Sequence, residues 1–185
     1  PEAPSEKVLR TYAGRHVSGR MTLTAFAYQG SAIEQCLKDF QTAVSQGKYD
    51  LVVYLGHNGL MDFYLNGVAP DAARRKKPEC MVLCCKSQKY FSKHIAHLEA
   101  TPILLTTQFM YPGSFLLRDV LEEWVKGAGL KAYRAAAGNA YAANQKIAQN
   151  AALGVFADLE KAPDNKPGAV AGENETAAMA PKITK

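Results

Sequence analysis

Two residues in this sequence, His57 and Cys85, have side chains suited to nucleophilic catalysis, and each follows a short apolar run. A thiol attacks a carbonyl carbon as its thiolate, so it needs a neighbour that accepts its proton and a site that stabilises the oxyanion. Histidine suits the first task because its ordinary pKa lies close to working pH, and backbone amides of a glycine-containing turn suit the second. The pair therefore indicates a cysteine hydrolase.

The runs that lead to these residues, 51–55 and 80–85, lack polar alternation, which is typical of central parallel strands covered on both faces. In an open α/β sheet, ligands bind and chemistry takes place just beyond the carboxyl ends of such strands. We therefore expect the imidazole, the thiol and the glycine turn 56–59 to lie on one edge of a sheet.

Further elements are predicted upstream of these runs. Residues 21–28 alternate and are rich in strand formers, and a short strand is possible over 8–12. Ser31 and Glu34 have the spacing of a capping box before a helix that ends at Gly47. A strand, a helix and a strand in this order predict a right-handed parallel crossover.

Downstream of Cys85, the pattern predicts a helix over 87–99, a strand over 103–107, and a helix that is capped by Ser114 and ends near residue 127. The loop 108–113 is then expected on the same edge as His57 and Cys85. The alanine-rich segment 131–160 predicts one long helix or two, with Gly138 and Gly154 as weak points, and Asn66-Gly67 predicts a small hairpin beside the site.

The expected fold class is α/β, a three-layer sandwich with a mostly parallel sheet and helices on both faces. The chain of 185 residues suits one sizeable domain, which we assign to 1–161. Residues 162–185 have few large apolar side chains and three prolines, so a disordered tail is predicted there.

Charge and hydropathy argue against several classes of partner. The net charge of +5 comes largely from the quartet 74–77 and from scattered lysines, without the interleaved aromatics of a nucleic-acid site. No run reaches the length of a membrane span and no secretory signal is present. The chain begins at Pro1, so a cytoplasmic location and export with removal of a signal both stay open, as does the oligomeric state.

The four cysteines match no common zinc or disulfide pattern, so free thiols are predicted. On a strand, Cys80 and Cys84 share one face while Cys85 points the opposite way. Cys36 and Cys80 are core residues by position. His94 and His97 lie three apart on a helix without further ligands, so neither a metal nor another cofactor is predicted.

The two strand ends, Leu51-Val52-Val53-Tyr54-Leu55-Gly56-His57 and Met81-Val82-Leu83-Cys84-Cys85, resemble the caspase-like clan of cysteine peptidases, which includes caspases, metacaspases, legumains, gingipains and separases. In that clan one strand ends in a catalytic His followed by Gly, and the next ends in a catalytic Cys after a small residue. The resemblance implies a peptidase with a peptide or protein substrate. It implies that His57 is the base, that Cys85 rather than Cys84 is the nucleophile, and that the amides of Gly59 and Cys85 form the oxyanion hole.

The sequence departs from the clan's pattern in two respects. The clan's His-Gly is here His57-Asn58-Gly59, so the oxyanion amide could belong to Asn58. The clan's sheet also begins with an upstream strand and helix, which are missing here or replaced by 1–18. An inactive relative that binds a peptide or partner in the same cleft is therefore an alternative. A flavodoxin-like ligand-binding domain is a more distant one, since no glycine-rich phosphate loop follows the strand 21–28.

The resemblance also implies a substrate pocket walled by the loop that follows the next strand. The candidate substrate-binding residues are Asp62, Lys86, Gln108, Met110, Tyr111 and Ser114. Asp62 could instead orient His57 or act as a plain turn residue, and Lys86 could bind an acidic group or remain a solvated lysine.

Overall fold

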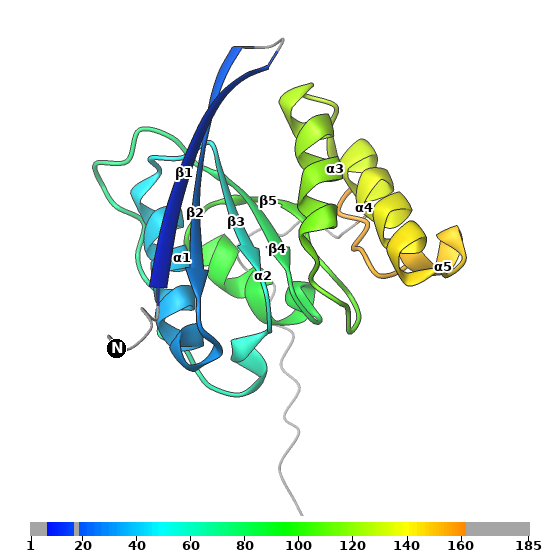
Figure 1. Ribbon diagram of the computed structural model, residues 1–185. Helices are drawn as coiled ribbons and strands as arrows, with labels where there is room; N and C mark the ends of the chain where they lie inside the picture. The colour runs from blue at the N-terminus through cyan, green and yellow to red at the C-terminus, as the bar shows by residue number, and fades with distance from the viewer. Residues whose placement is uncertain (1–6, 17–18, 162–185) are drawn as a thin grey trace, which may run out of the picture.

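A three-stranded parallel sheet forms the centre of the molecule (Figure 1). The computed structural model describes residues 7–16 and 19–161, so the predicted tail over 162–185 lies outside the described residues. The strands are β3 (Leu51–Leu55), β4 (Glu79–Leu83) and β5 (Thr101–Leu104), with β4 in the middle. Each begins and ends within about two to three residues of its predicted position, which is the usual error for boundaries.

Helices cover both faces of this sheet, as predicted. One face packs against α1 (Ile33–Gln46) and α2 (Ser87–His97), and the other against α3 (Ser114–Val125), α4 (Leu130–Gln145) and α5 (Gln149–Leu153). Alternate residues of β4 enter the two cores: Cys80 and Val82 face α1 and α2, whereas Met81 and Leu83 face α3 and α4. All four are buried, which explains why this run lacks polar residues.

The predicted strand over 21–28 is present but belongs to a different sheet. It is β2 (Gly19–Tyr28), and it pairs antiparallel with β1 (Lys7–His16) along their whole length. The predicted parallel crossover from 21–28 into the sheet is therefore wrong. Every residue of β2 except Thr24 and Tyr28 is exposed, Met21 and Leu23 included, so this strand is not covered on its faces as a central parallel strand is. Figure 1 shows the hairpin alongside α1, with its distal end beyond the sheet.

The N-terminal end of α1 differs from the prediction, whereas its C-terminal end is as predicted. The capping box is not formed, because Ser31 lies inside a 3₁₀ turn, η1 (Gly30–Ala32), and Ala32 occupies the N-cap. The predicted exit at Gly47 is confirmed, since this residue has φ +58° and caps the helix. A Cβ there would lie 2.4 Å from the carbonyl oxygen of Lys76, so both the backbone angle and the space require glycine.

Three other local predictions need correction. Asn66-Gly67 lies in an irregular segment rather than a hairpin. Ser114 is the first residue of α3, and Gly113 is its N-cap. The segment 131–160 does form two helices, and Gly154, one predicted weak point, is the C-cap of α5. Gly138, the other, stays helical and packs against Leu153, and the chain turns instead at Lys146 (φ +54°).

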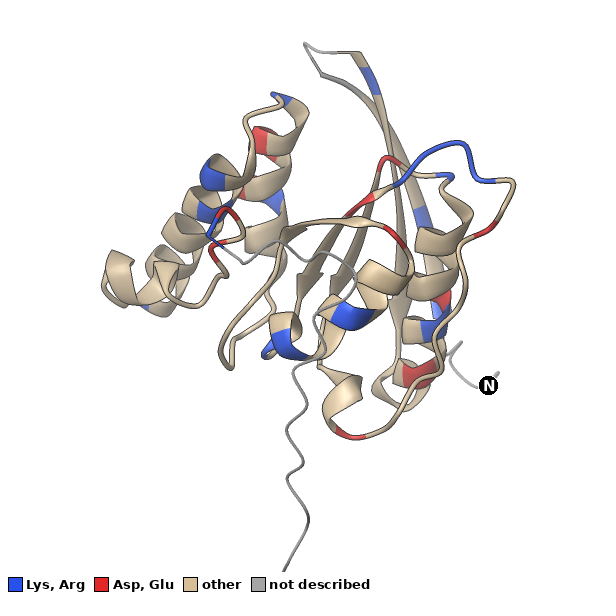
Figure 2. Cartoon of the chain, turned by 180° about the vertical axis from the view of Figure 1, so that it is seen from behind, with Lys and Arg blue, Asp and Glu red and all other residues tan. Residues whose placement is uncertain are grey.

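The basic quartet 74–77 lies in the connection that leads into β4 (Figure 2). Its residues are not simply solvated. The Arg74 guanidinium donates to the backbone oxygen of Leu98 at 2.6 Å and pairs with Glu99, and Lys77 also pairs with Glu99 at 3.2 Å. The quartet therefore fastens this connection to the end of α2.

Candidate functional site

The parallel register of β3 and β4 brings His57 and Cys85 to the same edge of the sheet. Leu55 is the partner of Leu83, and the Gly56 amide continues the ladder by donating to the Leu83 oxygen at 3.2 Å. His57 lies two residues after Leu55, and Cys85 lies two residues after Leu83. They therefore leave neighbouring strands at equivalent positions, at the carboxyl ends where α/β sheets hold their sites.

Asn58 joins the turns that carry the two residues. Its side chain is buried; the amide nitrogen donates to the Cys85 backbone oxygen at 2.6 Å, and the amide oxygen accepts from the Leu60 amide at 3.1 Å. The hydroxyl of Tyr54 adds a hydrogen bond of 2.6 Å to the backbone oxygen of His57. The extra residue relative to a His-Gly sequence thus links the turn after β3 to the turn after β4.

Gly59 follows directly and begins the 3₁₀ turn η2 (Gly59–Met61). Its carbonyl oxygen accepts hydrogen bonds from the amides of Asp62 and Phe63, both at 3.0 Å. A Cβ at residue 59 would lie 2.7 Å from the Phe63 ring, so the close packing of this turn requires glycine. The turn brings Asp62 back toward His57.

His57 and Asp62 form a hydrogen-bonded pair, with 2.9 Å between Nε2 and Oδ2. An ionised carboxylate only accepts hydrogen bonds, so Nε2 carries the proton and Nδ1 is left as the basic nitrogen when the ring is neutral. Both side chains are open to solvent, at 65% and 63% exposed. Of the three roles considered for Asp62, namely substrate binding, orientation of His57 and a plain turn residue, the geometry supports orientation of the histidine.

The Cys85 thiol is held by the backbone of Met110. The Met110 amide donates to Sγ at 3.4 Å, and Sγ donates to the Met110 oxygen at 3.6 Å. Within the described part of the chain, no hydrogen bond joins Cys85 to His57. The sulfur is therefore turned toward the loop that follows β5 and is not hydrogen-bonded to the imidazole of His57.

Burial separates Cys85 from Cys80 and Cys84, which are fully buried, whereas Cys36 is half-buried like Cys85. Cys84 is fully buried, and this burial raises its pKa strongly, with the neighbouring Cys85 as a smaller cause. Burial likewise raises the pKa of Cys80 to about 12 and that of Cys36 to about 11. A nucleophilic thiol must ionise near neutral pH. Cys80 and Cys84 share a core, as their strand positions predict, and Cys36 lies on α1. Cys85 is therefore the candidate because it is accessible at the carboxyl end of β4.

The turn after Cys85 depends on polar contacts that the sequence pattern does not reveal. Lys86 has φ +51°, and its amide donates to the Gln108 oxygen at 2.9 Å. Ser87 and Thr106 are buried and hydrogen-bonded to each other, and the Ser87 hydroxyl also donates to the Val82 oxygen at 2.7 Å. These contacts fix the position of the Cys85 turn against the end of β5.

The predicted substrate loop comes to the Cys85 edge, but its members differ in role. Met110 contributes its backbone to the thiol, while its side chain is buried in the core beneath α3. Tyr111 is exposed, and Gln108 is exposed and donates to the Gly154 oxygen at 3.4 Å. Ser114 is exposed in the first turn of α3.

Phe109 is the site residue that sequence reasoning missed. Its ring is exposed and lies under the Lys86 ammonium, which is 4.0 Å from the ring centroid. The available signal was a bulky aromatic residue next to Tyr111 in a loop expected at the sheet edge. The solvated lysine considered for Lys86 is thus a half-buried residue packed on this ring.

Two further properties of the described residues bear on function. Across 7–16 and 19–161, no group of three or more His, Cys, Asp or Glu side chains is arranged to hold a metal ion. No helix in the described part of the chain has the length and apolar character needed to cross a membrane.

Fold and site together define an α/β protein that carries a histidine and a cysteine at the carboxyl ends of adjacent parallel strands. No protein-family model, no curated protein and no solved structure matches this chain.

Proposed function

We propose that this protein is a cysteine hydrolase, most closely akin to the caspase-like peptidases, with Cys85 as nucleophile and His57 as base. The observation that carries the proposal is the register of β3 and β4, which brings the two residues to equivalent positions beyond Leu55 and Leu83. The Asn58 bridge between the two turns adds support, because it limits how far they can separate.

In the proposed reaction, Sγ of Cys85 attacks the carbonyl carbon of a peptide bond, and Nδ1 of His57 takes the thiol proton. The carbon–nitrogen bond then breaks, the leaving nitrogen receives that proton, and a thioester remains. Water hydrolyses the thioester with His57 again acting as base. Asp62 orients the ring by holding Nε2, and the amides of Gly59, Asn58 and Cys85 are the candidate donors to the oxyanion.

The reaction requires the sulfur to leave Met110 and turn toward the imidazole. Side-chain rotamer changes take place in picoseconds to nanoseconds, far faster than typical turnover. Catalytic hydrogen bonds are often absent in an unliganded enzyme and form only with substrate. The contact between Sγ and the Met110 oxygen, 3.6 Å long, is weak enough to be exchanged.

The test is covalent labelling of the thiol by a peptidyl chloromethyl ketone, with mass spectrometry of the modified residue. We expect labelling at Cys85, its loss in Cys85→Ala, and a rate reduced by about 100-fold in His57→Ala, the lower range for loss of a general base. Cys84→Ala is the matched control and should keep the wild-type rate. A thiol that reacts no faster than free cysteine, together with no effect of His57→Ala, would rule out the proposal.

A second candidate function is peptide binding without turnover, in an inactive relative of the same clan. The favouring observation is that Met110 holds the thiol while His57 pairs with Asp62 at the surface. Hydrolysis of a peptide substrate that is lost in Cys85→Ala would exclude this function. Peptide binding that survives Cys85→Ala, without product formation by the wild type, would support it.

A further inference from the structure

Two exposed aromatic rings flank the residue that holds the Cys85 thiol. Phe109 and Tyr111 are 63% and 60% exposed, whereas Met110 between them is buried. The Met110 backbone contacts Sγ through both its amide and its carbonyl oxygen. The segment that carries both rings therefore lies next to the Cys85 side chain.

Neighbouring groups support both rings. The Lys86 ammonium lies over the Phe109 ring, and Tyr111 stacks on Phe115 with 6.5 Å between centroids and an interplanar angle of 13°. The Tyr111 amide donates to the Tyr141 hydroxyl at 3.1 Å, which fastens the loop to α4. A binding surface whose side chains are already ordered loses little conformational entropy when a ligand arrives.

Exposed apolar patches mark ligand-binding sites, and aromatic side chains contribute much of the contact energy there. We propose that Phe109 and Tyr111 recognise an apolar side chain, aromatic or aliphatic, on the substrate residue whose carbonyl group Cys85 attacks. This inference rests on the proposed hydrolase function and adds the class of substrate to it. Contact with the two rings removes apolar surface of the substrate from water, which favours such peptides over charged ones.

The charges at this edge provide the competing alternative. Lys86 could read an acidic substrate side chain, but its ammonium is already engaged over Phe109. Asp62 could read a basic one, but its carboxylate is engaged by His57. The two rings, in contrast, remain mostly exposed despite their contacts with Lys86 and Phe115, so they provide open apolar surface at this edge.

The experiment compares three peptidyl chloromethyl ketones that differ only in the residue bearing the ketone: Phe, Asp or Lys. We expect the Phe reagent to label Cys85 about tenfold faster than the other two, the ratio that burial of part of one ring provides. Phe109→Ser and Tyr111→Ser should each reduce this ratio by about threefold or more, while Phe109→Leu should keep most of it. Far-UV circular dichroism checks that each variant is folded.

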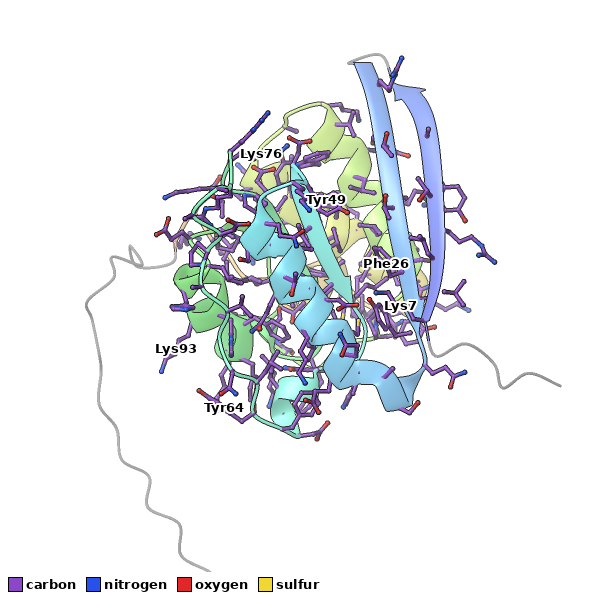
Figure 3. All side chains as sticks on the ribbon, turned by 90° about the vertical axis from the view of Figure 1, so that its left-hand side faces the viewer. Lys7, Phe26, Tyr49, Tyr64, Lys76 and Lys93 are labelled. Carbon is purple, nitrogen blue, oxygen red and sulfur yellow. The ribbon has the colours of Figure 1, made fainter. Side chains whose placement is uncertain are left out.

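Tyr49→Ser is the matched control, because Tyr49 is an exposed tyrosine shortly before β3 and thus near the amino end of the sheet (Figure 3). It should leave the ratio unchanged. Iodoacetamide, a small uncharged electrophile, is measured in parallel on the wild type and on His57→Ala. It reports the Cys/His pair without requiring side-chain recognition.

The outcomes separate the inference from the function on which it rests. If iodoacetamide alkylation of Cys85 depends on His57 but the Asp or Lys reagent is fastest, the apolar preference is wrong and the hydrolase proposal stands. An Asp preference that is lost in Lys86→Gln would assign recognition to Lys86 instead. If no reagent labels Cys85 faster than free cysteine, both proposals fail.

Discussion

Cys84 and Cys85 are neighbours in the chain, but Cys84 is inaccessible to a substrate whereas Cys85 is partly exposed. Cys84 is packed among the side chains of α1 and α2, where burial raises its pKa, and Cys85 is half-buried at the edge of the sheet. Strand alternation predicts that the two side chains point in opposite directions, but it does not predict which one reaches the solvent. That depends on how far β4 extends, and β4 ends at Leu83, two residues before Cys85.

Asp62→Asn should slow alkylation of Cys85 by iodoacetamide by about two- to fivefold, since pairs of exposed charged groups contribute roughly 0.2–1 kcal/mol. The physical reason is the loss of the charged acceptor that orients His57. Glu122→Gln, which removes one negative charge from the exposed side of α3, is the control and should not change the rate. A loss as large as that in His57→Ala would mean that Asp62 does more than orient the ring.

At the scale of the elements, the two turns act as one unit because Asn58 connects them. Its side chain is buried and satisfied at both ends, by the Cys85 oxygen and the Leu60 amide. The turn after β4 is held in addition by Ser87 and Thr106. The register of β3 and β4 brings the two turns together, and the contacts between the turns then fix the thiol relative to the imidazole.

Asn58→Ala should lower the free energy of unfolding by about 1–3 kcal/mol, because it removes a buried side chain that bonds both turns and leaves the Cys85 oxygen without this donor. Asn66→Ala is the matched control: Asn66 is exposed in the next connection, and its replacement should change stability by less than about 0.5 kcal/mol. Urea denaturation followed by circular dichroism measures both. Equal effects of the two substitutions would contradict a bridging role for Asn58.

The elements that the sequence predicts well are those with strong local signals. The apolar runs at β3 and β4, the apolar stripe of α1 and the left-handed exit at Gly47 are all present as predicted. The capping box fails because Ser31 is drawn into a 3₁₀ turn, which propensity rules for a helix start do not include. The break at Lys146 also lacks a signal, because Gly138 is the predicted weak point in α4 and it stays helical, whereas Gly154 does end α5.

Predicting the candidate site succeeded for its strand ends and failed for its contacts. His57 and Cys85 follow from parallel strands of matching length, which is a property of the sequence pattern. The Met110 backbone contact, the Asn58 bridge and the Phe109 ring under Lys86 depend on three loops meeting in space. Contacts between residues far apart in the chain leave no periodic trace in the sequence, and for that reason they were not predicted.

At the scale of the whole molecule, the β1–β2 hairpin is attached through its base. The Asp39 carboxylate on α1 accepts from the Lys7 ammonium at 2.6 Å and from the Tyr28 hydroxyl at 2.5 Å. Lys7 also lies 4.6 Å from the centre of the Phe26 ring, and Figure 3 shows both residues at the base of the hairpin. A two-stranded hairpin is at best marginally stable alone, so this attachment matters for its order.

Hairpin order should depend on pH through Asp39. Burial alone would raise the pKa of this carboxyl, but hydrogen bonds from Lys7, Tyr28 and Gln35 outweigh it and lower the pKa. A lowered pKa stabilises the attached state above the unfolded value of about 3.9, and this stabilisation is lost as pH falls through the lower folded value. We therefore expect NMR signals of the hairpin amides to remain native down to about pH 4 and to change below it.

Asp39→Asn should weaken the attachment at neutral pH by about 1 kcal/mol and remove most of the acid dependence. Hydrogen exchange at the amides of β1 and β2 measures this local opening. Glu34→Gln on the same helix, which removes a carboxylate paired with Lys38, is the control and should leave the hairpin unchanged. Equal protection in wild type and Asp39→Asn at neutral pH would contradict the assigned anchor.

The position of β3 at the border of the sheet has a consequence for handling the protein. Among the described residues only β4 pairs with β3, so its outer peptide groups are not part of any ladder. Unprotected borders of this kind are where foreign strands add to a folded domain and start aggregates. Solubility at high concentration and recovery after heating will then depend more on whether other chains can pair with this edge of β3 than on how much apolar surface the two cores bury.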